Sequence, residues 1–315
     1  MSVRRLLVLP HLKIHNANAL SSPFTIGFPA MTAWLGFVHA LQRKLNAAGY
    51  PSLDLVATGV ISHQCNLQTF QGPGDFVHSI IGTGNPLDKE GNRSAFIEEA
   101  RCHLDVSLLI EYQADEETQQ LMRQPDFIEV ISHQLMRMKV AGGDLQAFEL
   151  PLLQVLDDSD EVAQGKVMRS LMPGFALIER RELMQQAMEQ GADALDALLE
   201  YLTIHHHCTE DNDGNVIWKS QRKVDGDGDK PGWIVPIATG FQGISELGEA
   251  KNQRDPNIPH RFAESIVTLG EFRMAHRIKQ LDEVLWRYHT DLNKNLYLCQ
   301  QAQTESKETA NDGFY

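Results

Sequence analysis

Apolar and polar residues alternate in several segments of the N-terminal half of the chain. In the first segment, apolar residues recur at even positions from Leu6 to Ile14, and only Pro10 interrupts them. A period of two is typical of a half-buried strand, and a proline inside it indicates an edge or a bulge. Similar patterns predict strands over residues 4–15, 53–67, 101–112 and 145–156.

Two other segments carry apolar residues three and four positions apart, which is the spacing of one buried helix face. The first includes Trp34 and Leu41 and ends at Gly49. The predicted helices cover residues 30–48 and 126–140.

The order of these elements is βαββαβ, so we expect an α+β fold with a ferredoxin-like or RRM-like core over residues 1–158. A long insertion between the second and third strands, residues 68–100, is rich in turn sequences. The third strand has one aromatic residue, at its end, and lacks the aromatic pattern that stacks bases in RRM domains. We therefore expect loops, rather than the sheet face, to bind a ligand.

The rest of the chain is less regular, and we expect a mixed C-terminal region over residues 159–303. Its predicted elements are helices over 162–171 and 179–202, a hairpin over 205–219, a strand over 232–240 and a long helical stretch over 262–289. The polar residues 304–315 are expected to form a disordered tail.

The chain is acidic, with 28 Lys and Arg residues against 42 Asp and Glu residues and a formal net charge of −14. This makes it a poor candidate for non-specific binding to nucleic acid or to an anionic membrane. However, residues 1–53 contain no acidic residue, whereas residues 144–213 contain 15. One explanation of this asymmetry is a basic sector that faces a polyanion and an acidic sector that faces a basic protein. The alternative is that both sectors are simply solvated faces.

The four cysteines are far apart and form no disulfide framework, which is typical of reduced thiols. The apolar run that begins at Leu6 stops at Pro10, too early for a secretory signal. No segment approaches the roughly 18 apolar residues of a membrane span. We expect a cytoplasmic protein.

Signals for enzymatic chemistry are weak. Residues 205–208 read His-His-His-Cys, but zinc ligands are usually separated by two to four residues. Residues 225–229 resemble part of a calcium loop without its final Glu. No phosphate-binding loop, zinc-protease motif or serine-hydrolase motif is present. We predict no catalytic residue, no metal site and no cofactor.

An RNA-cutting protein of this fold would need a general acid and base, usually histidine. His15, His39 and His63 are candidates for those roles, but the sequence shows no compact arrangement of His with Lys or Ser. The loop after the first strand offers other chemistry. Its Asn and Ser side chains can bond to base edges, and backbone N–H groups near a helix start suit phosphate. Ordinary turn formation is the alternative explanation for this loop.

The run LPHLKIHNANALSSPFTIGFPAMTAWLGFVHALQRKL, residues 9–45, resembles the N-terminal part of a known family. The family is the second Csy subunit of type I-F CRISPR surveillance (Cascade) complexes, a Cas-five-class, RAMP-type protein. Further matching segments follow in order and cover nearly the whole chain: NPLDKEGNRSAFIEEARCHLDVSLLI, MKVAGGDL, LMPGFALIER, LDALLE, KPGWIVPIATGF, RFAESIVTLGEF and LWRYH. Residues 205–229 match poorly, so the resemblance gives the His-Cys cluster no role.

The resemblance implies a non-catalytic subunit of an antiviral defence complex. Such a subunit binds the 5′ handle of the CRISPR RNA, pairs with the large Csy subunit and abuts a backbone Csy subunit. Contact with target DNA is left open. The alternative is a RAMP-type endoribonuclease that processes precursor CRISPR RNA and loses activity on His15→Ala or His63→Ala.

Chemistry and family position together suggest RNA-binding residues of three kinds. Polar residues are expected to hydrogen-bond bases and backbone, cationic residues to contact phosphates, and one tryptophan to stack on a base or to lie in the core. The candidates are Asn16, Asn18, Ser21, Ser22, Arg43, Lys44, Arg137, Lys139, Lys230, Trp233, Arg254 and Arg261.

Overall fold

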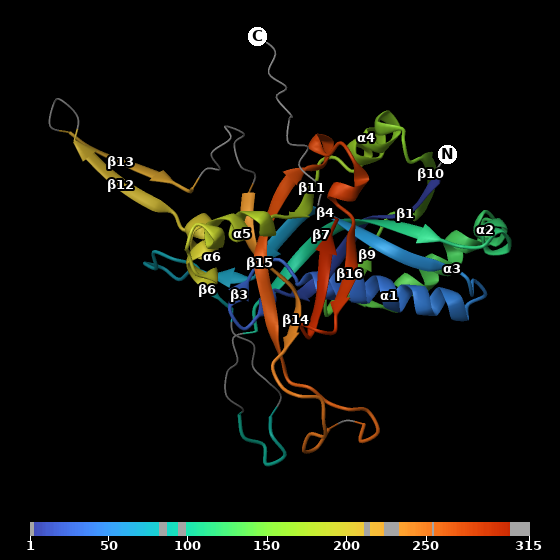
Figure 1. Ribbon diagram of the computed structural model, residues 1–315, viewed down its shortest axis with the longest axis horizontal. Coiled ribbons are helices and arrows are strands. Elements are labelled where there is room, and N and C mark those ends of the chain that lie inside the picture. The colour runs from blue at the N-terminus through green and yellow to red at the C-terminus, as the bar shows by residue number, and fades with distance from the viewer. Residues whose placement is uncertain are drawn as a thin grey trace, which may run out of the picture.

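Three long antiparallel strands form the centre of the molecule in the computed structural model (Figure 1). The structure describes residues 3–81, 87–93, 99–210, 215–223, 233–253 and 255–302. The central strands are β1 (Val3–Asn18), β4 (Asp54–Leu67) and β7 (Arg101–Gln113), and β7 lies between the other two. All three were predicted from alternation and are confirmed.

The central strands belong to an antiparallel sheet of 11 strands among the described residues. The order is β11-β15-β14-β17-β16-β4-β7-β1-β9-β8, and β10 also pairs with β1. The additional strands are β8 (Lys139–Val140), β9 (Gly143–Ala147), β10 (Leu152–Asp157), β11 (Phe175–Glu179), β14 (Trp233–Gly243), β15 (Ala263–Met274), β16 (Trp286–Asp291) and β17 (Leu296–Gln301). The predicted α+β class is confirmed, and one sheet runs through both parts of the chain.

Three short hairpins lie outside this sheet. Their strands are β2 (Leu20–Ser22) with β3 (Thr25–Ile26), β5 (Thr69–Phe70) with β6 (Ser79–Ile80), and β12 (His205–Glu210) with β13 (Val216–Gln221). The last pair confirms the predicted hairpin at 205–219. It projects away from the sheet, and every residue of its strands is exposed (Figure 1).

Helix α1 (Met31–Ala47) covers one face of the central strands, as predicted. Trp34, Leu41 and Leu45 pack there in the main core against Leu7 and Leu108. The other helices are α2 (Glu116–Met122), α3 (Asp126–Leu135), α4 (Glu161–Ser170), α5 (Arg181–Glu189) and α6 (Ala194–Leu202). None of them in the described chain is long and apolar enough to cross a membrane.

The opposite face of the central strands is covered over only part of its length. Leu6, Val8 and Leu109 form a second core there with α4 and with the 3-10 turns η1 (Ala275–Arg277) and η2 (Leu281–Glu283). Beyond that core the exposed or half-buried side chains on this face are polar. They include Lys13, His15, His63, Gln64, His103 and Asp105.

Bulges allow β1 to present apolar side chains to the covered half of this face and polar side chains to the open half. The register of β1 against β7 shifts between Leu9 and Leu12, so the β1 residues that point to this face change from even positions, such as Leu6 and Val8, to odd positions. The bulge falls at the predicted position, Pro10. Past it, Lys13 and His15 point to the open half, and a second shift separates Ile14 from the end of the strand.

Several predicted elements are wrong. Residues 262–289 form β15, η1, η2 and β16 rather than a helix. Residues 268–271 of β15 are all buried, and a continuously buried strand shows no alternation to distinguish it from a helix. The segments predicted as one strand at 145–156 and one helix at 179–202 are each divided, the first near Pro151 and the second at Gly191, where φ is +102°.

Two other boundaries differ from prediction. Helix 126–140 ends at Leu135, and the chain continues into the turn before β8. The segment 16–29, expected to be a loop, contains the end of β1 and the β2–β3 hairpin. The predicted tail, 304–315, lies outside the described residues.

Ionic contacts join the first strand to the last third of the chain. The guanidinium of Arg4, almost fully buried, contacts Glu111 at 3.4 Å, Asp158 at 2.7 Å and Asp282 at 2.9 Å. Arg287 on β16 pairs with Glu111 at 2.6 Å. Removing one member of such a buried group is costly, because its partners keep their charge without compensation.

Glu179, at the end of β11, carries the carboxyl group with the clearest perturbation. Its carboxylate accepts a hydrogen bond from the N–H of Gln301 at 3.1 Å and pairs with Arg181 at 3.2 Å. Burial raises the pKa of Glu179 to about 7, although the charge of Arg181 opposes the shift. The folded protein therefore holds this proton in a range where the unfolded chain releases it.

We expect Glu179 to make stability fall as pH rises from about 4.5 to 7, because only the unfolded state loses the proton there. Glu179→Gln removes this titration. The variant's free energy of unfolding minus that of the parent should rise by on the order of 2 kcal/mol between pH 5 and pH 8. Urea melts at both pH values measure it, with the exposed Glu189→Gln as control for net charge. A difference that is flat with pH contradicts the argument.

Candidate nucleic-acid interface

A groove of about 410 Å³ lies beside the N-terminal half of α1. One wall is the helix, and the other is formed by the end of β1, the β2–β3 hairpin and the β8–β9 turn. The lining residues are Asn18, Ser21, Pro29, Ala30, Ala33, Gly36, Phe37, Ala40, Lys139, Ala141 and Gly142. The groove thus brings together three of the predicted RNA-binding residues, from segments more than 100 positions apart in the sequence.

The helix wall is formed mostly by small side chains. Ala33, Gly36 and Ala40 recur at intervals of three and four, so they share one side of α1, next to the side that packs in the core. A Cβ added at Gly36 would meet no atom within 4 Å, which shows that space is open above it. The wall therefore lets a ligand approach the helix closely.

The start of α1 lies at one end of the groove, where the Ala33 N–H donates to the Ala30 carbonyl at 2.9 Å. Ala30 is the N-cap residue, and its side chain makes no capping hydrogen bond. The first turn contains no acidic residue. The positive end of the helix dipole favours an anion such as a phosphate at this position.

Cationic side chains lie at both sides of the groove. Lys139 is exposed and forms an ion pair of 2.6 Å with Asp144, which holds the pKa of that carboxyl below its usual value. Arg101, which sequence analysis did not single out, pairs across the sheet with Asn18 and contacts Glu99 at 2.6 Å. Its buried Nε has no hydrogen-bond partner within the described chain. In the sequence, Arg101 is only a polar residue at the start of an alternating strand, and that pattern gives no sign of a binding role.

Arg43 and Lys44 lie within about one helical turn of Ala40, the last lining residue of α1. Arg43 is exposed and Lys44 half-buried. Arg137 is exposed in the turn before Lys139. These three cations do not line the groove, but each lies within four positions of a lining residue along the chain.

The polar loop residues make hydrogen bonds within their own turns. The exposed amide of Asn18 accepts from the N–H of Leu20 and donates to its carbonyl, at 3.2 and 3.1 Å. Ser21 bonds to the Thr25 hydroxyl at 2.8 Å, and the buried Ser22 does so at 2.7 Å. Asn18 and Ser21 remain at the groove surface, whereas Ser22 is enclosed in the hairpin.

Four other candidates lie apart from the groove or are not described. Asn16, with φ of +60°, accepts a hydrogen bond from Gln68 on the other side of β1. Arg261 donates to Asn295 at the far end of β14 and β15. Lys230 and Arg254 lie outside the described residues, as does the segment 225–229.

Trp233, at the start of β14, is 64% exposed and is therefore not a core residue. Its ring lies 6.0 Å from that of Phe272, which contacts Phe28 edge-on at 5.2 Å, and Phe28 stacks on Trp34 of α1 at 5.4 Å. A chain of aromatic contacts thus connects this exposed ring to the beginning of α1.

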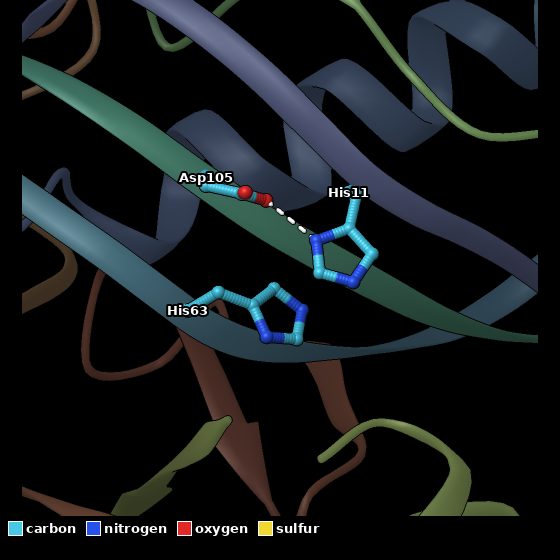
Figure 2. A group of neighbouring side chains, drawn as sticks. All are labelled: His11, His63 and Asp105. Atoms are coloured by element: carbon cyan, nitrogen blue, oxygen red, sulfur yellow. Dashed lines mark hydrogen bonds and ion pairs between the residues drawn. The ribbon is translucent and has the colours of Figure 1, made fainter. Parts of the chain in front are cut away.

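The histidines of the sequence occupy different surfaces. His11 stacks on His63 on the open half of the sheet (Figure 2). His15 stacks on His103 on the same half. His39 lies on the exposed side of α1. The triple-histidine segment alternates along β12, so His205 and His207 share one side. Consecutive residues of this segment therefore point to opposite sides of the strand.

The fold and the groove together define a mixed α+β protein with a large antiparallel sheet and a groove beside the start of a helix. Residues 7–299 match the family described as CRISPR-associated protein (Cas_Csy2). The chain is 36% identical over 321 residues to the CRISPR-associated protein Csy2 of Pseudomonas aeruginosa strain UCBPP-PA14, covering 93% of this chain and 94% of that protein. The chain belongs to the Csy2 family of CRISPR-associated proteins.

The open space at Gly36 makes a stability prediction. Gly36→Ala should raise the free energy of unfolding by about 0.5–1 kcal/mol, because alanine favours a helix and meets no neighbour here. Gly143→Ala is the contrasting variant, since its Cβ would lie 2.7 Å from the His15 carbonyl oxygen. Denaturant melts should show a gain for the first and a loss for the second. A loss for both would mean that the side of α1 at Gly36 is not open.

Proposed function

We propose that this chain is a non-catalytic subunit of a type I-F CRISPR surveillance complex and that its α1 groove binds the 5′ handle of the CRISPR RNA. The observation that carries the proposal is the convergence of Asn18, Ser21 and Lys139 on one groove in a member of the Csy2 family. A single strand needs only local positive charge and polar groups, so an acidic total is compatible with this role.

The geometry of the groove suits a short RNA segment. A phosphate at the positive end of α1, which has no side-chain cap, places the strand against the small residues Ala33, Gly36 and Ala40. The strand then continues toward Arg43 and Lys44, and Lys139 contacts it from the opposite wall. In addition, the exposed ring of Trp233 offers a surface for one unstacked base.

The strand order β4-β7-β1-β9 supports an RRM-like, RAMP-type core as part of this proposal. The other Csy subunits require protein-binding surfaces. Helices α4 and α6 expose Val162, Leu195 and Leu199 within the acidic region 144–213. We assign this mixed surface to the large Csy subunit and place the backbone Csy subunit beside the RNA groove.

Blocking the groove tests the RNA site. Gly36→Glu places a carboxylate where the strand would run and should weaken binding of the handle RNA by the full chain at least tenfold, about 1.4 kcal/mol. Gly36→Ala is the matched control and should bind as the parent does. Fluorescence anisotropy with handle RNA and a scrambled RNA measures both. Equal binding by the Glu variant would remove the groove as the interface.

Salt dependence gives an independent test of Lys139. Each phosphate neutralised on a single strand contributes about −0.7 to the slope of log K against log salt. Lys139→Gln should reduce the magnitude of the slope by about that amount. Lys294→Gln, in the exposed β16–β17 turn, is the matched control and should leave it unchanged. A slope unaffected by Lys139→Gln contradicts the proposed phosphate contact.

The non-catalytic role is tested with precursor CRISPR RNA. The RNA should remain intact after prolonged incubation with excess purified chain. Cleavage that disappears in a variant carrying both His15→Ala and His63→Ala would instead establish the endoribonuclease alternative. Cleavage that persists in that variant would point to a contaminating nuclease, which a repeat after further purification distinguishes.

A further inference from the structure

His11, His63 and Asp105 come from the three central strands and meet on the open half of the sheet (Figure 2). One ligand atom of each lies within 4.8 Å of the other two. His11 Nδ1 is 3.0 Å from Asp105 Oδ1, and the two imidazole rings stack with centroids 4.2 Å apart. We propose that these three side chains bind one divalent transition-metal ion of the kind represented by Zn²⁺.

Two bulges on opposite sides of β7 bring the histidines to this point. β1 shifts its register against β7 between Leu9 and Leu12, and His11 adopts the left-handed backbone conformation there, with φ of +47°. β4 shifts its register just after Ser62, which leaves His63 as the extra residue. Bulges re-aim side chains and are enriched beside functional sites. Here both re-aim a histidine toward the same part of the central strand.

The surroundings of His63 fix which of its nitrogens is available. Its Nδ1 lies 2.6 Å from the carbonyl oxygen of Pro173, which can only accept, so this nitrogen carries the proton. The lone pair is therefore on Nε2, which accepts a hydrogen bond from the Ser107 hydroxyl at 2.7 Å. A backbone carbonyl bonded to the outer nitrogen is the usual way in which a metal-binding histidine is oriented.

The Ser107 hydroxyl also holds the other bulge. Its oxygen accepts a hydrogen bond from the backbone N–H of His11 at 3.0 Å. The same hydroxyl thus organises both histidines from the central strand. When an ion binds, His63 Nε2 loses its hydrogen bond from the Ser107 hydroxyl and coordinates the ion instead. The hydrogen bond from the His11 N–H to the Ser107 oxygen is kept.

The donor set selects the class of ion. Two imidazoles and one carboxylate suit zinc and neighbouring first-row metals, whereas calcium and magnesium prefer oxygen ligands alone. Ligand atoms of a tetrahedral zinc site with bonds of ~2.0–2.1 Å lie roughly 3.3 Å apart. The 3.0 Å between His11 Nδ1 and Asp105 Oδ1 is close to this separation, and the proton that the two groups share is released to solvent when the ion binds. The His63 ligand atom, within 4.8 Å of both, then needs only a small shift toward them.

Three protein ligands leave a fourth position of a tetrahedral ion open to water or to an oxygen of a bound ligand. The ion also has a structural effect. Each bulge interrupts the hydrogen-bond ladder between β7 and a neighbouring strand, and an ion held by all three strands reconnects them at that level. Metal binding should therefore raise the thermal stability of the chain.

Other histidines of the described chain offer a weaker site. His15 and His103 stack in a similar way, but among the described residues neither belongs to a set of three His, Cys, Asp or Glu ligand atoms that lie within 4.8 Å of one another. His205 and His207 share one side of the exposed β12 strand, with ring centroids 6.3 Å apart. These two pairs provide matched controls.

The test uses the full chain, treated with a chelator and then titrated with Zn²⁺ by calorimetry and with Co²⁺ by visible absorption. The parent should bind one equivalent at this site, with Co²⁺ bands typical of low coordination number. His63→Gln and Asp105→Asn should each weaken binding by more than the roughly 10–100-fold that loss of an outer hydrogen-bond partner costs. His15→Gln and the double variant His205→Gln with His207→Gln should retain it.

Thermal melts with and without Zn²⁺ provide the second measurement. Zn²⁺ should raise the midpoint of the parent and the controls but not that of Asp105→Asn. His11→Asn tolerates the left-handed conformation and serves if His63→Gln does not fold. Binding that is unchanged in Asp105→Asn and His11→Asn, or that is lost only in the β12 double variant, would overturn the proposal and leave a histidine–aspartate ion pair.

Discussion

The length of the three central strands governs the rest of the molecule. β1, β4 and β7 extend beyond the second core that covers one of their faces, so that face must be apolar at one end and polar at the other. On β1 the side chains that point to this face are Leu6 and Val8 before the bulge and Lys13 and His15 after it. The bulges in β1 and β4 thus shift which positions of each strand point to the polar end of the face.

On the helix side of the sheet, one helix likewise serves both the core and a binding surface. α1 places its large side chains in the main core, and the side next to them carries alanine and glycine. The core side stabilises the fold, while the small side leaves room for a ligand next to backbone donors. The groove and the core thus lie on two sides of one helix. The packing of the core side fixes the shape of the groove before any ligand binds.

The sequence predicted those elements whose pattern is local and failed where burial or pairing is long-range. β1, β4, β7 and α1 each carry a clear period, and Pro10 marked the bulge. β15 was missed because it is enclosed on both faces and shows no alternation. Asn18, Ser21 and Lys139 could be chosen by residue type, but their shared groove depends on how β1 and β8 meet. His11 and Asp105 gave no signal, since only the register shifts across β7 bring them to His63.

The strand order also has a consequence for biosynthesis. β16 and β17 are the last strands in the described chain, yet they lie between β4 and β14 within the sheet. Translation at about 5–20 residues per second separates β10 from β17 by roughly 7–30 s. During that interval β4 lacks its β16 neighbour, and Glu111 lacks Arg287. The sheet between β4 and β14 is therefore completed only after β16 and β17 have been made.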